Sequence, residues 1–145
     1  MAYTITVANR ALYLIQTGAV NLETDDIKVI LMADGFVFDR DDHHVYADVS
    51  DDELESENGY EQFTMAITTP LPVETDASDQ SIFTCDDVEW TADGGSLVAD
   101  GAIFIDDTVA DDPILFHVDF GGTVTATDTF TFTIQNIEID YEQGS

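Results

Sequence analysis

The stretch LVADGAIFIDDTVADDPILFHVDF, residues 97–120, decides the fold of this chain. Two runs rich in Ile, Val and Phe, residues 97–105 and 114–120, have the length and composition of β-strands. The acidic, proline-containing connection between them, residues 106–113, is typical of a loop. This part of the chain therefore predicts neighbouring strands in a β-protein.

Further strands are predicted on both sides of this stretch. Residues 27–32 read as a strand that is buried on both faces, whereas residues 62–69 and 129–139 alternate apolar and polar side chains. Shorter strands are expected at residues 81–85 and 88–90. Loops or turns are expected at residues 39–50, 58–59, 70–80, 93–95 and 121–122, with a helical turn beginning at residues 50–53.

One amphipathic helix is predicted at the front of the chain. Apolar side chains recur at helical spacing over residues 7–15, with Thr4 or Thr6 as the cap and Gly18 as the left-handed stop. One helix followed by short strands with regular turns predicts a mainly β fold, an antiparallel β-sandwich with the N-terminal α-helix packed against it. The length predicts a single domain spanning residues 1–145.

The charge of the chain is extreme. Thirty-one Asp and Glu residues stand against 3 Lys and Arg residues, which gives a formal charge of −28, yet 44% of the residues are hydrophobic. Such a chain must hold its carboxylates on the surface of a real core. In molar salt the Debye length is about 3 Å, and most of the self-repulsion disappears. We therefore expect adaptation to a salt-saturated interior, as in halophilic archaea and their viruses, rather than an acidic outlier of a low-salt cytosol.

The composition also argues against several classes of partner. Arg10, Lys28 and Arg40 are too few to form a phosphate-binding footprint, so neither nucleic acid nor an anionic membrane is an expected partner. The chain has no apolar run long enough to span a membrane, and its first residues do not resemble a secretion signal. Cys85 is the one cysteine, so no internal disulfide is expected, and its predicted role is that of a small buried apolar side chain.

The strongest candidate for chemistry is a cluster of Asp39, Asp41, Asp42, His43 and His44. Carboxylates and imidazoles can bind a divalent metal. Their spacing differs from that of a calcium loop, however, and adjacent histidines in an extended segment point in opposite directions. We interpret the cluster as a solvated loop and predict neither a metal nor a cofactor.

Other signals of catalysis are weak. Motifs for a serine nucleophile, a phosphate-binding loop or a zinc protease do not occur in the sequence. Acidic pairs recur at predicted loops and strand ends, which suits a solvent adaptation better than the two opposed carboxylates of a glycosidase. His117 lies inside a predicted strand and is interpreted as structural or interfacial, and Trp90 as a core or interface anchor. We predict a protein that is not an enzyme.

The order of the segments resembles a family of small virion structural proteins of tailed viruses of bacteria and archaea. The resemblance covers nearly the whole chain. It is carried by the N-terminal helix and by six further segments: NLETDDIKVILM at residues 21–32, NGY at 58–60, FTCDDVEWTA at 83–92, ADGAIFIDDT at 99–108, PILFHVDFGG at 113–122 and TFTFTIQNIEID at 129–140. The chain departs from the family by its added acids, which fits a haloarchaeal host.

The resemblance implies a non-enzymatic structural protein located in the virion after synthesis in the host cytoplasm. Within that class we expect a capsid decoration or turret protein that self-associates on the head of a haloarchaeal tailed virus. The alternatives are a tail, baseplate or fibre component that contacts the host and, from another class, a carbohydrate- or metal-binding β-sandwich of the host. The expected partners are other copies of the chain and either the major capsid protein or neighbouring tail proteins.

Like-charged copies can associate only through surfaces that exclude most carboxylates. The segments poorest in acids are the helix face within residues 7–15 and the Thr-rich stretch 123–135. The candidate interface residues are Val7, Ala11, Leu14, Thr129, Thr131, Thr133 and Gln135.

Overall fold

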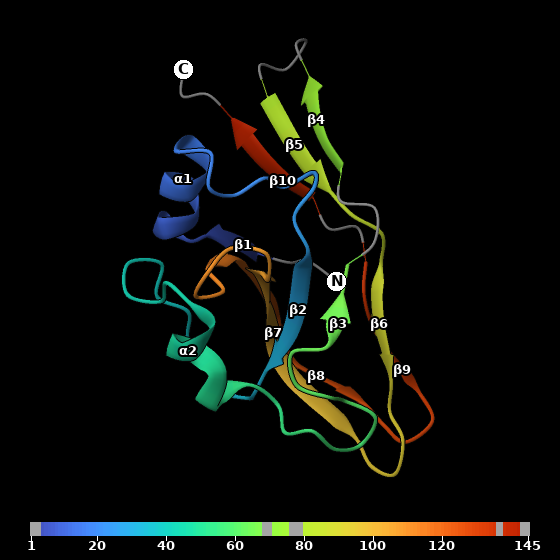
Figure 1. The fold of residues 1–145 in the computed structure, drawn as a ribbon. Coiled ribbons are helices and arrows are strands. Elements are labelled where there is room, and N and C mark those ends of the chain that lie inside the picture. The colour runs from blue at the N-terminus through green and yellow to red at the C-terminus, as the bar shows by residue number, and fades with distance from the viewer. Residues whose placement is uncertain (1–3, 68–70, 76–79, 136–137, 143–145) are drawn as a thin grey trace.

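Two long strands, β7 (Leu97–Asp106) and β8 (Ile114–Ala126), form the centre of the structure (Figure 1). The computed structural model describes residues 4–67, 71–75, 80–135 and 138–142. β7 and β8 are the two runs predicted from the sequence, and they pair antiparallel with Phe104 opposite Phe116. Most of β7 and the first part of β8 are buried, so this hairpin supplies the middle of the core.

Three antiparallel sheets are built around this hairpin in the described part of the chain. The largest has the strand order β1-β8-β7-β2-β3, in which β1 is Thr4–Val7, β2 is Ile27–Met32 and β3 is Met65–Ala66. A second sheet has the order β10-β5-β4, with β4 at Leu71–Thr75, β5 at Gln80–Thr84 and β10 at Glu138–Glu142. The third pairs β6 (Val88–Thr91) with β9 (Thr131–Ile134). The fold is therefore mainly β and antiparallel, as predicted.

The start of the predicted helix is wrong. Residues 4–7 form strand β1 on the outer edge of β8, and helix α1 covers Asn9–Gln16. The N-cap is Ala8, whose side chain makes no capping hydrogen bond, so neither Thr4 nor Thr6 has the predicted role. Pairing with β8 satisfies the backbone of these residues, and all four are β-branched, which favours a strand over a helix. The helix ends as predicted, with Gly18 at a φ of 81°.

The predicted turn at Gly121-Gly122 is also wrong. β8 continues through these residues to Ala126, and the pairing with β7 changes register between Ala99 and Gly101. The two glycines have φ angles of 78° and 158° and belong to the additional residues of the β8 bulge. A glycine pair can serve a bulge as well as a turn, because both need backbone conformations that other residues avoid.

Three other local predictions need correction. Within the expected 39–50 loop a helical turn, α2 (Tyr46–Val49), precedes the 3-10 turn η1 (Ser50–Asp52), which occupies the predicted capping-box position. The predicted strand 62–69 is reduced to β3, with Phe63 at a φ of 55°. The expected 70–80 loop contains β4, and Pro72 is accommodated because β4 is an edge strand.

The predicted final strand is divided into β9 and β10, and Thr129 has a φ of 76° before β9 begins. Phe132 and Ile134 point into the core, whereas Phe130, predicted on the same face, is 65% exposed. Asn136 lies outside the described residues.

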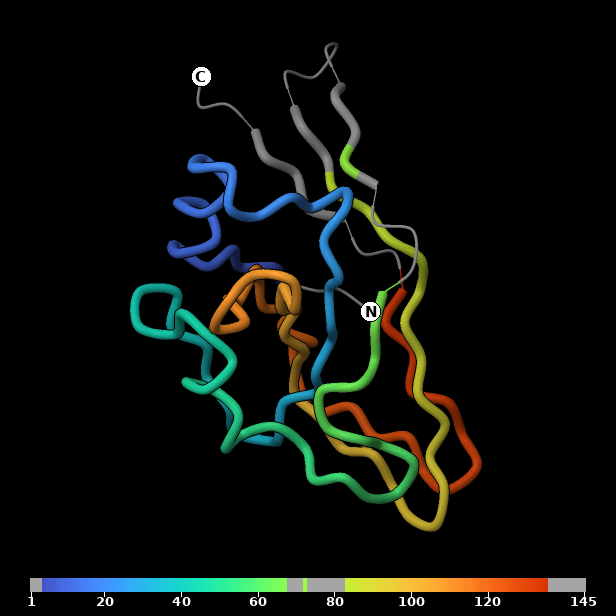
Figure 2. Tube along the Cα trace, viewed as in Figure 1, coloured from blue at the N-terminus to red at the C-terminus, as the bar shows by residue number. Residues whose placement is uncertain are grey.

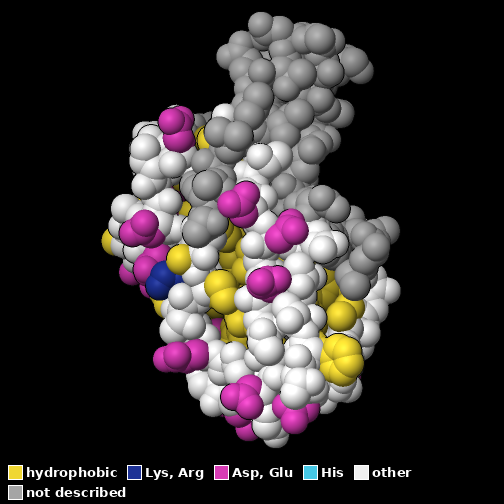
Figure 3. Space-filling view, turned by 90° about the vertical axis from the view of Figure 1, so that its right-hand side faces the viewer, with side chains coloured by type: hydrophobic (Ala, Val, Ile, Leu, Met, Phe, Trp, Pro, Cys, Tyr) yellow, Lys and Arg dark blue, Asp and Glu magenta, His cyan; other side chains and the backbone are white. Residues whose placement is uncertain are grey.

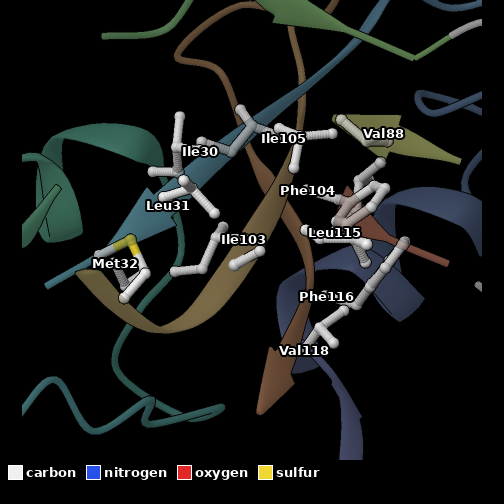
Figure 4. Close-up of a cluster of buried hydrophobic side chains, with 14 of the residues drawn as sticks. Ile30, Leu31, Met32, Val88, Ile103, Phe104, Ile105, Leu115, Phe116 and Val118 are labelled. Atoms are coloured by element: carbon white, nitrogen blue, oxygen red, sulfur yellow. The ribbon is translucent and has the colours of Figure 1, made fainter. Parts of the chain in front are cut away.

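Figure 4 shows part of the core, in which buried side chains of β2, β7 and β8 lie together with Val88 of β6. Phe104 and Phe116 stack at the centre with ring centroids 4.3 Å apart, and Phe83 of β5 meets Phe116 edge-on at 6.1 Å. Trp90 of β6 is 5% exposed and packs between Tyr60 and Phe132. The interpretation of Trp90 as a core anchor is confirmed.

Candidate interaction surfaces

An apolar groove lies beside the outer face of α1. It has a volume of about 540 Å³, and one of its nine lining residues, Glu23, is acidic. Its lining includes Leu12 and Ile15 of the helix and, from other parts of the chain, Leu22 and Pro72. Leu12 is 38% exposed and the neighbouring Tyr13 is 57% exposed. The helix therefore presents two of the four large exposed hydrophobic side chains of the described residues, the others being Val37 and Phe130.

The same helix carries one of the few cations. The guanidinium of Arg10 lies over the Tyr13 ring, 5.9 Å from its centroid. The carbonyl of Arg40 accepts the N–H of Asn9 at 3.2 Å, which places a second basic residue close to the start of α1. Lys28 forms an ion pair with Asp107 at 3.5 Å. Two of the three basic residues thus lie near the start of α1, beside the acidic turn whose Asp41 accepts a hydrogen bond from the Asn9 side chain.

The candidate residues of the helix face differ in their accessibility. Ala11 is buried against this chain's own core and is not available to a partner, and Leu14 is half-buried against the same core. Val7 belongs to β1 and pairs with Phe116. A partner contact on this helix would therefore use Leu12 and Tyr13, which the candidate set does not include. Leu12 belongs to the apolar helical pattern of residues 7–15, but that pattern does not show which of its side chains face the core.

The Thr-rich stretch forms an uncharged strip along β9. Thr131 is exposed and paired with Thr91, and Thr133 is half-buried and paired with Glu89. Thr129 and Gln135, at the two ends of the strip, are also exposed. The exposed ring of Phe130 adds an apolar element to it. Figure 3 shows scattered carboxylates and apolar side chains gathered near the centre of the face presented by the right-hand side of Figure 1.

The Asp39–His44 cluster is a turn closed by its own side chains. Asp39 Oδ1 accepts the N–H groups of Asp41 and Asp42, at 2.9 and 3.3 Å, and His43 Nδ1 accepts the N–H of Asp39 at 2.9 Å. The ring of His44 is instead held by the Asp41 carbonyl. Within the described residues, no group of three or more His, Cys, Asp or Glu side chains is arranged to hold a metal ion.

His117 and Cys85 occupy apolar surroundings. The His117 ring stacks on Phe38 with centroids 5.2 Å apart and lies 5.8 Å from Phe36, and this burial lowers its pKa to about 4. Burial raises the pKa of the Cys85 thiol to about 12, with a smaller contribution from Asp86 and Asp87. At neutral pH both side chains are therefore uncharged, which suits the packing roles expected for them.

The structure contains a buried carboxylate network that sequence reasoning missed. Glu53 is 3% exposed and accepts three hydrogen bonds, from Tyr46 Oη and Tyr60 Oη at 2.5 Å each and from the N–H of Phe63 at 3.0 Å. Burial and this carboxylate raise the pKa values of both tyrosines. Tyr60 Oη also accepts the N–H of Leu31 at 3.0 Å. The network fastens the long 33–64 segment to β2, and nothing in the sequence separates Glu53 from the many surface acids.

Neither α1 nor α2 is long and apolar enough to cross a membrane, and the described residues contain no other helix that could.

Comparison of the chain with protein-family models, with curated proteins and with solved structures finds no match to any of them. The surfaces around α1 and β9 are therefore interpreted from their own geometry and from the sequence.

Proposed function

We propose that this protein is a non-enzymatic structural component of the virion of a haloarchaeal tailed virus, a capsid decoration or turret protein that self-associates on the head. The resemblance of the ordered segments to small virion proteins supports the class, and the charge of −28 supports a salt-rich host. Its sites are surfaces rather than a catalytic centre, and its partners are other copies of the chain and the major capsid protein.

The observation that carries self-association is the exposed apolar surface of α1. Leu12 and Tyr13 are exposed beside a groove of about 540 Å³ with one acid in its lining. Removing such side chains from water is favourable, by roughly 25 cal/mol per Å² of apolar area. Repulsion between two copies is smallest where carboxylates are fewest. The α1 surface meets both conditions, and the uncharged strip on β9 offers a second contact of lower apolar content.

A β-sandwich is the finer architecture in this proposal. Trp90 and Phe132 of the β6–β9 pair pack together, and Phe132 also meets Phe120 of β8 with ring centroids 5.6 Å apart. In a sandwich the small sheet covers one face of the large sheet, which leaves the opposite side of β9 for a neighbour. This layering fits a rigid module that offers its outer faces to other virion proteins.

The test measures assembly with matched variants. Leu12→Glu and Thr131→Glu each add a carboxylate to one candidate surface, and Ala47→Glu adds one to an exposed position on α2. We expect Leu12→Glu to reduce self-association in molar KCl by light scattering, and either of the first two to reduce incorporation into particles. Circular dichroism should show all three variants folded. Particles that incorporate both surface variants as well as Ala47→Glu would refute the proposed surfaces. Absence of the wild-type protein from purified virions would refute the virion assignment and favour a host module.

A further inference from the structure

A buried carboxyl oxygen at the end of β7 lacks a hydrogen-bond partner. Asp106 was expected in a solvated connection, yet it is the last residue of β7 and is 0% exposed. Its Oδ1 accepts the N–H groups of Thr108 and Val109, at 2.9 and 3.2 Å, and so closes the turn after β7. Its Oδ2 is the one buried side-chain oxygen or nitrogen without a partner among the described residues. A buried ionised carboxylate in this state is strongly disfavoured.

The neighbouring group is a second carboxyl, that of Asp25. The N–H of Asp107 donates to the Asp26 carbonyl at 2.8 Å, and the N–H of Asp26 donates to Thr108 Oγ1 at 2.7 Å. These bonds bring the segment before β2 against the turn after β7. Burial, together with the Asp25 side chain, raises the pKa of Asp106 to about 7. Two adjacent carboxyls of which one is buried are stabilised when they share one proton.

We propose that Asp25 and Asp106 form a proton-binding site, in which protonated Asp106 Oδ2 donates a hydrogen bond to the Asp25 carboxylate and so holds the 21–26 segment against the turn after β7. Loss of the proton to solvent base leaves two negative charges facing each other in a poorly solvated place. The two segments then repel each other. The proton is the only species that moves, and no other reactant is needed.

Other charged groups lie close to this site but do not neutralise it. Lys28 pairs with Asp107, and Asp112 feels mainly its burial and the charge of Asp107, which together raise its pKa. The titratable and charged groups at this end of the sheet are Asp25, Asp26, Lys28, Tyr46, Asp106, Asp107, Asp111 and Asp112. With one lysine among them, the balance is negative. A proton shared by the two carboxyls would relieve part of this negative charge.

The site is connected to the apolar groove beside α1 and to the α2 segment. Asp25 Oδ2 accepts the N–H of Asn21 at 3.0 Å, and Asn21 lines the apolar groove beside α1. On the other side, the turn after β7 holds the α2 segment, through bonds from Tyr46 N–H to the Asp112 carbonyl and from Ile114 N–H to the His44 carbonyl, both at 2.9 Å (Figure 2). Deprotonation would therefore loosen a wall of the groove and the attachment of α2.

The decisive variant is Asp106→Asn, whose amide copies the protonated acid. Its oxygen can still accept the Thr108 and Val109 N–H groups, and its NH₂ can donate to Asp25. Relative to this variant, the unfolding equilibrium constant of the wild type should rise with pH, by up to about tenfold per pH unit, because the native state holds a proton that the unfolded chain releases. The window runs from the ordinary Asp value of 3.8 to about 7, above which the difference is constant. Asp42→Asn, an exposed control, should follow the wild type.

Two further measurements make the result specific. Carbon-13 NMR of the Asp106 carboxyl in molar KCl should show titration near pH 7, and Asp25→Asn should lower that midpoint. Amide exchange at Asn21 and Asp107, corrected for intrinsic base catalysis, should accelerate above the midpoint in the wild type but not in Asp106→Asn. A carboxyl that is ionised throughout pH 5–9 would overturn the proposal even if Asp106→Asn did not fold. So would a wild type destabilised when tetramethylammonium replaces potassium, since a bound metal cation would then neutralise the pair.

Discussion

Replacing Tyr60 by Phe tests whether the buried Glu53 network holds the long 33–64 segment in place. The substitution removes one oxygen and leaves the ring that packs against Trp90. That oxygen accepts the N–H of Leu31 and donates to Glu53 Oε2. Tyr60 is 3% exposed, so water cannot replace the lost partners without opening the structure.

The magnitude follows from the two bonds. A hydrogen bond to a charged group contributes about 1.5–3 kcal/mol, and a buried N–H left without a partner costs a similar amount. Since Glu53 keeps two other donors and part of the strain relaxes, we expect a loss of about 3 kcal/mol in the free energy of unfolding. With a urea dependence of about 2 kcal/mol per molar, the midpoint of unfolding should fall by about 1.5 M.

The assay is urea denaturation in molar KCl, monitored by circular dichroism. Urea is the denaturant because it leaves the ionic strength unchanged. Tyr13→Phe is the matched control: Tyr13 is 57% exposed, and the substitution should change stability by less than about 0.5 kcal/mol. Glu53→Gln should show strong coupling to Tyr60→Phe, because both act on one bond. Equal stabilities of Tyr60→Phe and Tyr13→Phe, or additive effects of the Glu53 and Tyr60 variants, would refute the role assigned to this network.

Three further predictions concern the charge, the bulge and the buried imidazole. The melting temperature should fall on transfer from molar KCl to about 0.05 M salt, where the screening length exceeds 10 Å, and an unchanged value would remove the argument for a salt-rich host. Gly101→Ala should destabilise the protein by about 1–3 kcal/mol in thermal melts, because its Cβ would lie 2.6 Å from the Val118 carbonyl oxygen and 2.8 Å from His117 Nε2. Relative to His117→Phe, the wild type should lose stability as the pH falls from 6.5 to about 4, since the unfolded chain binds a proton that buried His117 refuses, and melts of the two proteins across that range should show the difference.

The central strands could be predicted because they are continuous runs of apolar residues, a composition typical of buried strands. Residues 103–105 and 114–116 are apolar and fully or almost fully buried, and a run of this kind has few alternatives to a core strand. The elements that were missed depend on partners distant in sequence. Val7 was assigned to the helix and Thr4 or Thr6 to its cap, and the pairing of residues 4–7 with the free edge of β8 makes them a strand instead. Pro72 likewise signals a loop until the sheet places it on an edge strand.

The candidate surfaces were predicted only in part, for a different reason. Low acid content singled out α1 and β9, which contain no acids, but it could not separate the buried stripe of α1 from its outer face. Ala11 and Leu12 are adjacent and both apolar, yet Ala11 is 1% exposed and Leu12 is 38% exposed. The direction of the helix is set by its packing on β8, which composition does not contain.

Buried acidic residues are harder to predict, because the many surface acids of this chain make the few buried ones indistinguishable in the sequence. Glu53 and Asp106 are both buried, but their surroundings differ. Glu53 accepts hydrogen bonds from two phenol groups and one backbone N–H, whereas Asp106 uses one oxygen to close a turn and has its other oxygen near the Asp25 side chain. In a chain of mixed charge such residues stand out against their neighbours. Here they are the two buried acids among the described residues of a chain that has 31 acids. The physical distinction lies in desolvation, so screening by salt should stabilise the surface acids and leave the two buried ones almost unaffected. We therefore expect the changes in unfolding free energy caused by Asp106→Asn and Tyr60→Phe to be the same in low and high salt, while the stability of the wild type itself changes with salt. Salt-dependent effects of these two substitutions would contradict this separation of buried and surface acids.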